Sequence, residues 1–129
     1  MHRAPLPVHV LVVDDEPIIR AFLSDVLADL GFLVETAVHG ADALEKLARH
    51  SFQAVLLDLM MPVMDGREVL RRLRQDLAYA GLPVVVLSAA PAELLRGARD
   101  LGAAACIEKP FDLDTLLSAL SSVLTAAQD

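Results

Sequence analysis

Five short apolar runs alternate with five stretches of helical spacing along this chain of 129 residues. Three of the runs, the first, third and fourth, are almost continuously apolar and rich in valine and leucine. That pattern is typical of parallel strands buried on both faces. The runs are residues 10–13, 33–37, 53–57, 83–87 and 103–107. The alternation predicts an α/β fold in which helices cover both faces of an open parallel sheet.

The stretches between the runs carry signals for the ends of helices. Gly31 suits a C-terminal stop, Asp65 and Glu68 have the spacing of a capping box, and Asp112 is placed as an N-cap. Apolar residues recur every three or four positions, as on a buried helix face. These positions are Ile19, Phe22, Leu23, Val26, Leu27 and Leu30; Leu44, Leu47 and Ala48; Val69, Leu70, Leu73 and Leu77; Leu94, Leu95, Ala98 and Leu101; and Leu113, Leu116, Leu117, Leu120 and Leu124.

Composition excludes several classes of function. The 18 acidic and 11 basic residues give a formal net charge of −7, which disfavours a binder of nucleic acid or of anionic membranes. The single cysteine cannot form a disulfide within the chain and fits a reducing cytosol. We find no signal peptide and no apolar stretch of roughly 18 residues, so we expect a cytoplasmic protein without a membrane segment.

Polar residues follow the predicted strands at the sheet edge where ligands of such folds bind. Asp14 and Asp15 follow the first strand, Asp58 the third, Ser88 the fourth and Lys109 the fifth. Two carboxylates about 4 Å apart repel by roughly 4 kcal/mol at an effective dielectric near 20. Three carboxylates in one cleft therefore favour a bound cation, and oxygen ligands favour Mg²⁺ or Mn²⁺.

Each of these residues also has an ordinary structural explanation when taken alone. Asp14 and Asp15 fit a solvated turn beside a helix N-terminus, Lys109 fits a solvated lysine, and Ser88 fits a helix cap. Asp58 is harder to explain in this way, because a charge inside an apolar run is seldom structural unless it is paired. On the same edge as the acids, Lys109 becomes a partner for a carboxylate or a phosphoryl group.

Taken together, these residues resemble the receiver domain of two-component response regulators. The resemblance rests on Val-Asp14-Asp15-Glu, Leu-Asp58-Leu-Met-Met-Pro-Val-Met-Asp65-Gly66, Val-Leu-Ser88-Ala and Lys109-Pro110. It covers a domain at about residues 8–125 and implies a flavodoxin-like (βα)5 fold with strand order 2-1-3-4-5. Residues 1–7 and 126–129 are then expected to be loose termini.

The resemblance implies a role for each acidic residue. Asp58 would be the phosphoacceptor, which forms an acyl phosphate with a phosphoryl group from phosphohistidine. Asp15, Asp58 and the backbone carbonyl of Met60 would ligate Mg²⁺, for which Mn²⁺ can substitute, and Asp14 would act mainly through a metal-bound water. Met60 and Ala90 border the acyl phosphate in the family, and here neither side chain offers a group to orient an attacking water.

The resemblance also assigns roles to residues that follow the fourth and fifth strands. Lys109 would pair with Asp58 and then with phosphoryl oxygens, and Ser88 would be the hydroxyl drawn toward the phosphoryl group. The bond between Lys109 and Pro110 is expected to be cis. Cys106 stands where the family commonly has Tyr, Phe or His. We expect it to be a small buried strand residue, with a redox role as the alternative, and we expect signal transmission through this strand to be weak.

Two further sets of side chains are expected to be structural. The basic cluster on the third helix fits a solvated face that pairs with nearby acids rather than a DNA-binding surface, given the net charge of −7. Its members are Arg67, Arg71, Arg72 and Arg74. The histidines at positions 9, 39 and 50 do not have the spacing of a metal site.

The sequence therefore predicts a receiver in a two-component phosphorelay, a signalling switch rather than an enzyme that acts on other substrates. Its partners would be a histidine kinase or a histidine phosphotransfer protein, and a downstream protein contacted through the fourth and fifth helices. We expect a monomer or weak dimer that binds neither nucleic acid nor membranes. The chain would act by protein contact, relay phosphate, or be part of a longer protein.

Two other classes of protein remain as alternatives. A metal-dependent phosphohydrolase with an aspartyl nucleophile on the first strand places its second aspartate two residues later. Here Asp14 and Asp15 are adjacent, and Glu16 stands where that aspartate would be. An interaction module that does not depend on phosphate is disfavoured because the acidic, hydroxyl and lysine positions are all present.

Overall fold

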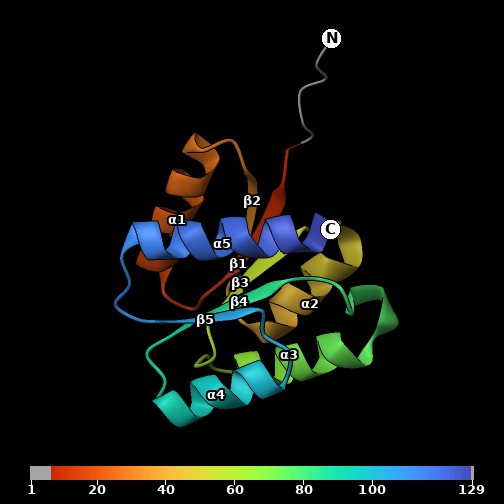
Figure 1. Ribbon diagram of the computed structural model, residues 1–129. Coiled ribbons are helices and arrows are strands. Elements are labelled where there is room, and N and C mark those ends of the chain that lie inside the picture. Colours follow the sequence, from red (N-terminus) through yellow and green to blue (C-terminus); the bar gives the residue numbers. More distant parts are fainter. Residues whose placement is uncertain (1–6, 129) are drawn as a thin grey trace.

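The computed structural model describes residues 7–128 and contains one five-stranded parallel sheet in the order β2-β1-β3-β4-β5 (Figure 1). This is the flavodoxin-like order that the resemblance to receiver domains implied. The strands are β1 (His9–Val13), β2 (Leu33–Ala37), β3 (Ala54–Leu57), β4 (Val84–Ser88) and β5 (Ala105–Glu108). The helices are α1 (Pro17–Asp29), α2 (Gly40–Arg49), α3 (Gly66–Gln75), α4 (Ala92–Asp100), α5 (Leu113–Gln128) and the short 3-10 helix η1 (Leu77–Tyr79).

Helices cover both faces of the sheet, with α1 and α5 on one face and α2, α3 and α4 on the other (Figure 1). Successive residues of a strand point to opposite faces. In β1, Val10 and Val12 pack with α1 and α5, whereas Leu11 and Val13 pack with the other three helices. Apart from His9 at the start of β1, every position of β1, β3 and β4 is therefore buried, which explains why their sequences are apolar without alternation.

The structure confirms the helix ends that were predicted from the capping residues Asp65, Asp112 and Gly31. Asp65 Oδ1 accepts a hydrogen bond from the backbone N–H of Glu68 at 3.0 Å, and Asp112 Oδ1 accepts one from Thr115 at 2.7 Å. Gly31 follows α1 with φ of +96°, a conformation that favours glycine.

Several boundaries differ from the sequence prediction, and β1, β3 and β4 are each shifted by one residue at one or both ends. Leu77 was expected in the third helix but lies in η1 and is 94% exposed, because Asp76 ends α3 and caps η1 through the N–H of Ala78 at 2.9 Å. Strand β5 begins at Ala105 rather than at position 103. Helix α5 continues to Gln128, past the expected boundary at 125, while residues 1–6 and 129 lie outside the described part. No helix within residues 7–128 is long and apolar enough to cross a bilayer.

Candidate functional site

The carboxyl edge of the sheet brings four acidic side chains together. Asp14 follows β1 and Asp58 follows β3, and these two strands are neighbours. Carboxylate oxygens of Asp14, Asp15, Glu16 and Asp58 all lie within 4.8 Å of one another. Asp14 and Asp58 are 2% and 4% exposed, whereas Asp15 and Glu16 are exposed. The cluster therefore has a buried base and an open side that faces solvent.

Lys109 reaches this cluster from the segment after β5. Its Nζ lies 2.7 Å from Asp14 Oδ2, 3.2 Å from Glu16 Oε1 and 3.5 Å from Asp58 Oδ2. The sequence prediction paired Lys109 with Asp58, but its shortest ion pair is with Asp14. Burial lowers the pKa of Lys109, but the hydrogen bond to Asp14 and the nearby carboxylate charges outweigh burial and raise it. The lysine therefore stays charged, and its bond to Pro110 is cis, as expected.

Asp58 is buried at the end of β3, and its negative charge is costly to hold there. Burial raises the pKa of its carboxyl group above the ordinary value, although the N–H of Met60 and the charge of Lys109 oppose this shift. The Met60 N–H donates to Asp58 Oδ1 at 3.2 Å. The second oxygen, Oδ2, is the one that lies toward Lys109. Asp58 therefore combines a fixed orientation with an ionised form that a further cation would stabilise.

The loop after Asp58 is held by a close approach of the backbone to α3. The N–H of Gly66, the first residue of α3, donates to the carbonyl of Leu59 at 2.9 Å. A Cβ atom at position 66 would overlap the backbone carbonyl of Asp58. Glycine is required here because of this approach, and it fixes the backbone on which the Asp58 side chain is carried.

Two residues that the sequence prediction gave no role also support the site. Glu16 belongs to the acidic cluster, and its N–H donates to Asp14 Oδ1 at 2.9 Å. Arg20, in the first turns of α1, donates from Nη1 to the backbone carbonyl of Asp14 at 2.6 Å. The adjacency of Glu16 to Asp14 and Asp15 was a usable signal, whereas the contact of Arg20 depends on how α1 leaves β1.

Ser88 ends β4, and Cys106 lies on the neighbouring strand β5. Ser88 is fully buried at the end of β4, and its Oγ accepts a hydrogen bond from the N–H of Ala90 at 3.2 Å. Helix α4 has no side-chain cap, so Ser88 is not the helix cap considered from the sequence. Cys106 is half-buried, and its thiol donates to the carbonyl of Leu95 at 3.4 Å. Burial raises the pKa of this thiol, which disfavours the reactive thiolate form and the redox alternative.

The donor set fits a small divalent cation. Carboxylate oxygens are the ligands that Mg²⁺ and Mn²⁺ prefer, and four carboxylates against one lysine leave excess negative charge. The exposed acids keep one side of the cluster accessible to solvent. The residues could therefore hold a metal ion and still admit a further oxygen ligand from a substrate.

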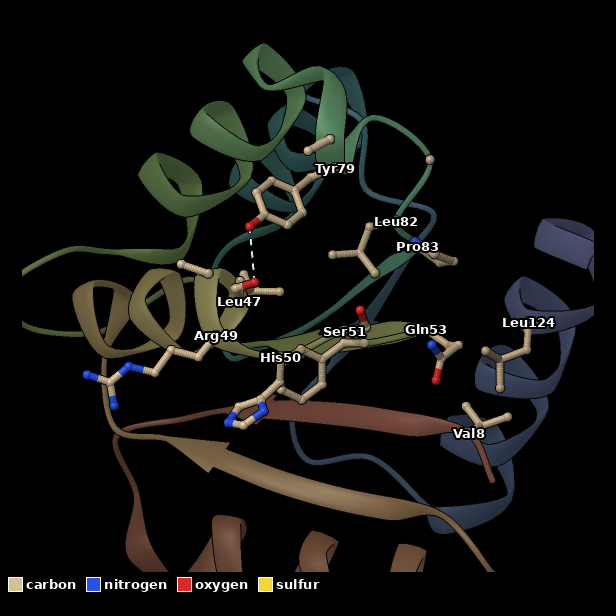
Figure 2. Close-up of a pocket in the computed structure, with 14 residues that line it drawn as sticks. Val8, Leu47, Arg49, His50, Ser51, Gln53, Tyr79, Leu82, Pro83 and Leu124 are labelled. Atoms are coloured by element: carbon tan, nitrogen blue, oxygen red, sulfur yellow. Dashed lines mark hydrogen bonds between the residues drawn. The ribbon is translucent and has the colours of Figure 1, made fainter. Parts of the chain in front are cut away.

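A separate hollow of about 580 Å³ lies at the opposite, amino end of the strands (Figure 2). Its walls come from the end of α2, the segment around η1, and Leu124 of α5. The hydroxyl of Tyr79 donates to the carbonyl of Leu47 at 3.0 Å and joins two of these walls. No member of the acidic cluster lines this hollow, so it is separate from the candidate metal site.

Comparison with known proteins agrees with the resemblance to receiver domains. The family model of the response regulator receiver domain matches residues 10–121. The response regulator MprA of Mycobacterium sp. (strain KMS) is 41% identical over 120 residues, which cover 92% of this chain and 51% of MprA. The sensor histidine kinase RcsC of Salmonella typhimurium is 42% identical over 113 residues, 87% of this chain and 12% of RcsC. The chain thus spans about half the length of MprA and a small part of RcsC.

The solved structures show the same relationship over a whole chain. The chemotaxis protein CheY4 of Vibrio cholerae has a TM-score of 0.85 and 35% sequence identity, and the match covers 92% of this chain and 99% of CheY4. A CheY-like receiver domain protein of Methanospirillum hungatei has a TM-score of 0.89 and 26% identity over 95% of this chain.

Proposed function

This chain belongs to the family of response regulator receiver domains, and from that premise we propose that Asp58 accepts a phosphoryl group from phosphohistidine. Receiver domains are signalling switches that interact with histidine kinases or phosphotransfer proteins. We propose one of these as the donor here. The observation that carries the proposal is a single one: Asp58 is buried, yet its carboxylate lies within an acidic cluster and 3.5 Å from Lys109.

In the proposed transfer, one carboxylate oxygen of Asp58 attacks phosphorus as the bond from phosphorus to the donor imidazole nitrogen breaks. The imidazole leaves with the electron pair of that bond. Negative charge develops on the three equatorial phosphoryl oxygens, and Lys109 lies close enough to Asp58 to stabilise it. The N–H of Met60 donates to Oδ1 of Asp58 and keeps the group oriented for attack.

The metal ligands are proposed to be Asp14, Asp15, Asp58 and the backbone carbonyl of Met60, with Asp14 acting mainly through a water. When Mg²⁺ is bound, it supplies positive charge that offsets both the carboxylates and the phosphoryl oxygens. The carboxylate cluster supports this assignment because its oxygens converge. Mn²⁺ is expected to substitute.

The response to phosphorylation is proposed to begin at Ser88. Its hydroxyl is buried beside the site and is bonded to the N–H of Ala90. Drawing the hydroxyl toward a phosphoryl oxygen would break that bond and alter the segment that leads into α4. A downstream protein would contact α4 and α5, and the protein is proposed to be a monomer or weak dimer.

The experiment is phosphorylation with a small acyl-phosphate donor in the presence of Mg²⁺. The intact mass should rise by about 80 Da, one phosphoryl group. The Asp58→Asn variant should show no rise, and Asp25→Asn, which changes an exposed carboxyl on α1, should behave as the unmodified protein. Specific, undiminished phosphorylation of Asp58→Asn would contradict the proposal. A metal-dependent phosphohydrolase would consume the donor without a lasting rise in its own mass. An interaction module would neither consume the donor nor gain mass.

A further inference from the structure

Helix α3 gathers positive charge on an otherwise acidic chain. It carries four arginines and one acid, Glu68, while the whole chain has a net charge of −7. Arg71 and Arg72 both pair with Glu68, and Arg74 donates to backbone carbonyl groups. Arg67 is exposed and makes no ion pair within residues 7–128. The expected pairing of the basic cluster with nearby acids therefore holds for Arg71 and Arg72 only, and Arg67 is the exposed arginine that no carbonyl group or acid engages within residues 7–128.

Arg67 borders an apolar hollow of about 460 Å³ between the segment after β3 and the beginning of α4. Met60, Met61 and Pro62 form one wall, and Leu94 of α4 forms the other. Met60 is 56% exposed, so this apolar wall faces solvent. The one acid in the lining, Asp65, is already bonded to the N–H of Glu68 at 3.0 Å.

Gly97 follows Leu94, the residue of α4 that lines the hollow. It lies three residues, and so about one turn, after Leu94 and therefore on the same side of the helix. A Cβ atom at position 97 would meet nothing within 4 Å, so packing inside the protein does not require glycine there. Glycine weakens a helix relative to alanine. Its low profile does, however, allow another chain to approach α4 closely.

We propose that the hollow lined by Met60, Pro62, Arg67 and Leu94, together with the open surface at Gly97, forms a groove that binds an acidic amphipathic helix of a partner protein. Apolar side chains of that helix would enter between Met60 and Leu94, as in other complexes of a helix with a groove. A carboxylate of the partner would pair with Arg67. The net charge of −7 repels an acidic segment from most of the surface, which makes α3 the complementary face. This interaction goes beyond the phosphoacceptor function and does not depend on it.

The test uses a labelled synthetic helix of leucine and glutamate, about four turns long, titrated with the unphosphorylated protein in Mg²⁺. Fluorescence anisotropy should show saturable binding. Arg67→Glu, which reverses the charge, and Gly97→Leu, which fills the groove, should each weaken binding by about tenfold. Arg49→Glu is the matched control, because it reverses an exposed charge on α2 away from the groove. It should change the affinity by less than about twofold.

Because the peptide and the protein are both acidic, general charge attraction would not produce the expected result. Absence of saturable binding would overturn the proposal. So would binding that Arg67→Glu and Gly97→Leu leave unchanged, or binding that Arg49→Glu weakens as much as they do. Both groove substitutions are at open positions, and circular dichroism of each variant would verify its fold before titration.

Discussion

Replacing Asp58 by asparagine should stabilise the metal-free protein, even though it removes the proposed phosphoacceptor. Asparagine has the same shape and keeps an oxygen that can accept the hydrogen bond from the Met60 N–H. It removes a buried negative charge from a cluster of four carboxylates. The expected gain is therefore electrostatic, and it should depend on both metal and pH.

The magnitude follows from two distances and the burial of the group. At an effective dielectric near 20, the attraction between Asp58 and Lys109 at 3.5 Å is about 5 kcal/mol. Repulsion from a carboxylate up to 4.8 Å away is at least about 3.5 kcal/mol, and Asp14 is one of three such neighbours. Asp15 and Glu16 are exposed and screened by solvent, so the repulsion from the buried Asp14 counts most, and it offsets most of the attraction to Lys109. The cost of burying the charge therefore decides the sign. We expect Asp58→Asn to raise the free energy of unfolding by on the order of 1 kcal/mol.

The pH dependence has a definite sign. Burial raises the folded-state pKa of Asp58 above its ordinary value. The contribution of Asp58 to stability is therefore fully present below the ordinary pKa and is lost as the pH rises through the folded-state pKa. The difference between Asp58→Asn and the unmodified protein should accordingly be absent in acid and appear toward neutral pH.

Urea unfolding in EDTA at several pH values, repeated with Mg²⁺, measures both effects. Mg²⁺ should stabilise the unmodified protein more than the variant, because the variant lacks one proposed ligand. Asp25→Asn is the control for the loss of an exposed carboxylate. A variant that is less stable than the unmodified protein in EDTA at neutral pH would refute the reasoning.

Three further predictions test other parts of the structure. Val63→Gly should raise the free energy of unfolding by about 1 kcal/mol, measured by thermal or urea unfolding. Val63 is 83% exposed and has φ of +71°, which strains a β-branched residue. Unchanged or lower stability of the variant would argue against this strain. Lys109→Gln should lower stability in EDTA by about 3 kcal/mol, since it leaves a buried carboxylate unpaired; a loss below about 0.5 kcal/mol would contradict this. When an acyl-phosphate mimic binds, hydrogen exchange should change more at residues 88–94 than at residues 103–107, because Cys106 is too small to couple β5 strongly to phosphorylation. An equal change in both segments would contradict this weak coupling.

The alternation of strands and helices could be predicted from the sequence, because strands buried on both faces are apolar at nearly every position. Strand order could not be predicted in this way and came from the resemblance to receiver domains. Leu77 shows a limit of periodicity: it continues the apolar spacing of α3, but Asp76 caps a new turn and η1 carries Leu77 into solvent. A local hydrogen bond of this kind competes with the helix and does not alter the spacing.

The gathering of the acids and Lys109 could likewise be predicted, because the carboxyl ends of parallel strands meet at one edge. The pairing within the cluster could not be. Three carboxylates lie within 3.5 Å of the lysine Nζ, and Asp14 is the closest at 2.7 Å. Differences of less than 1 Å depend on rotamers and on contacts such as that of Arg20 with the Asp14 carbonyl, which no spacing in the sequence records.

The proposed role of Asp58 is tested best by locating the phosphoryl group on the chain. After phosphorylation with an acyl-phosphate donor and Mg²⁺, borohydride reduces an acyl phosphate of aspartate to homoserine, which peptide mass spectrometry can locate. Homoserine is expected at position 58 and at no other aspartate. Homoserine at Asp14 or Asp15 with position 58 intact, or stable label on a serine, threonine or histidine instead, would contradict it.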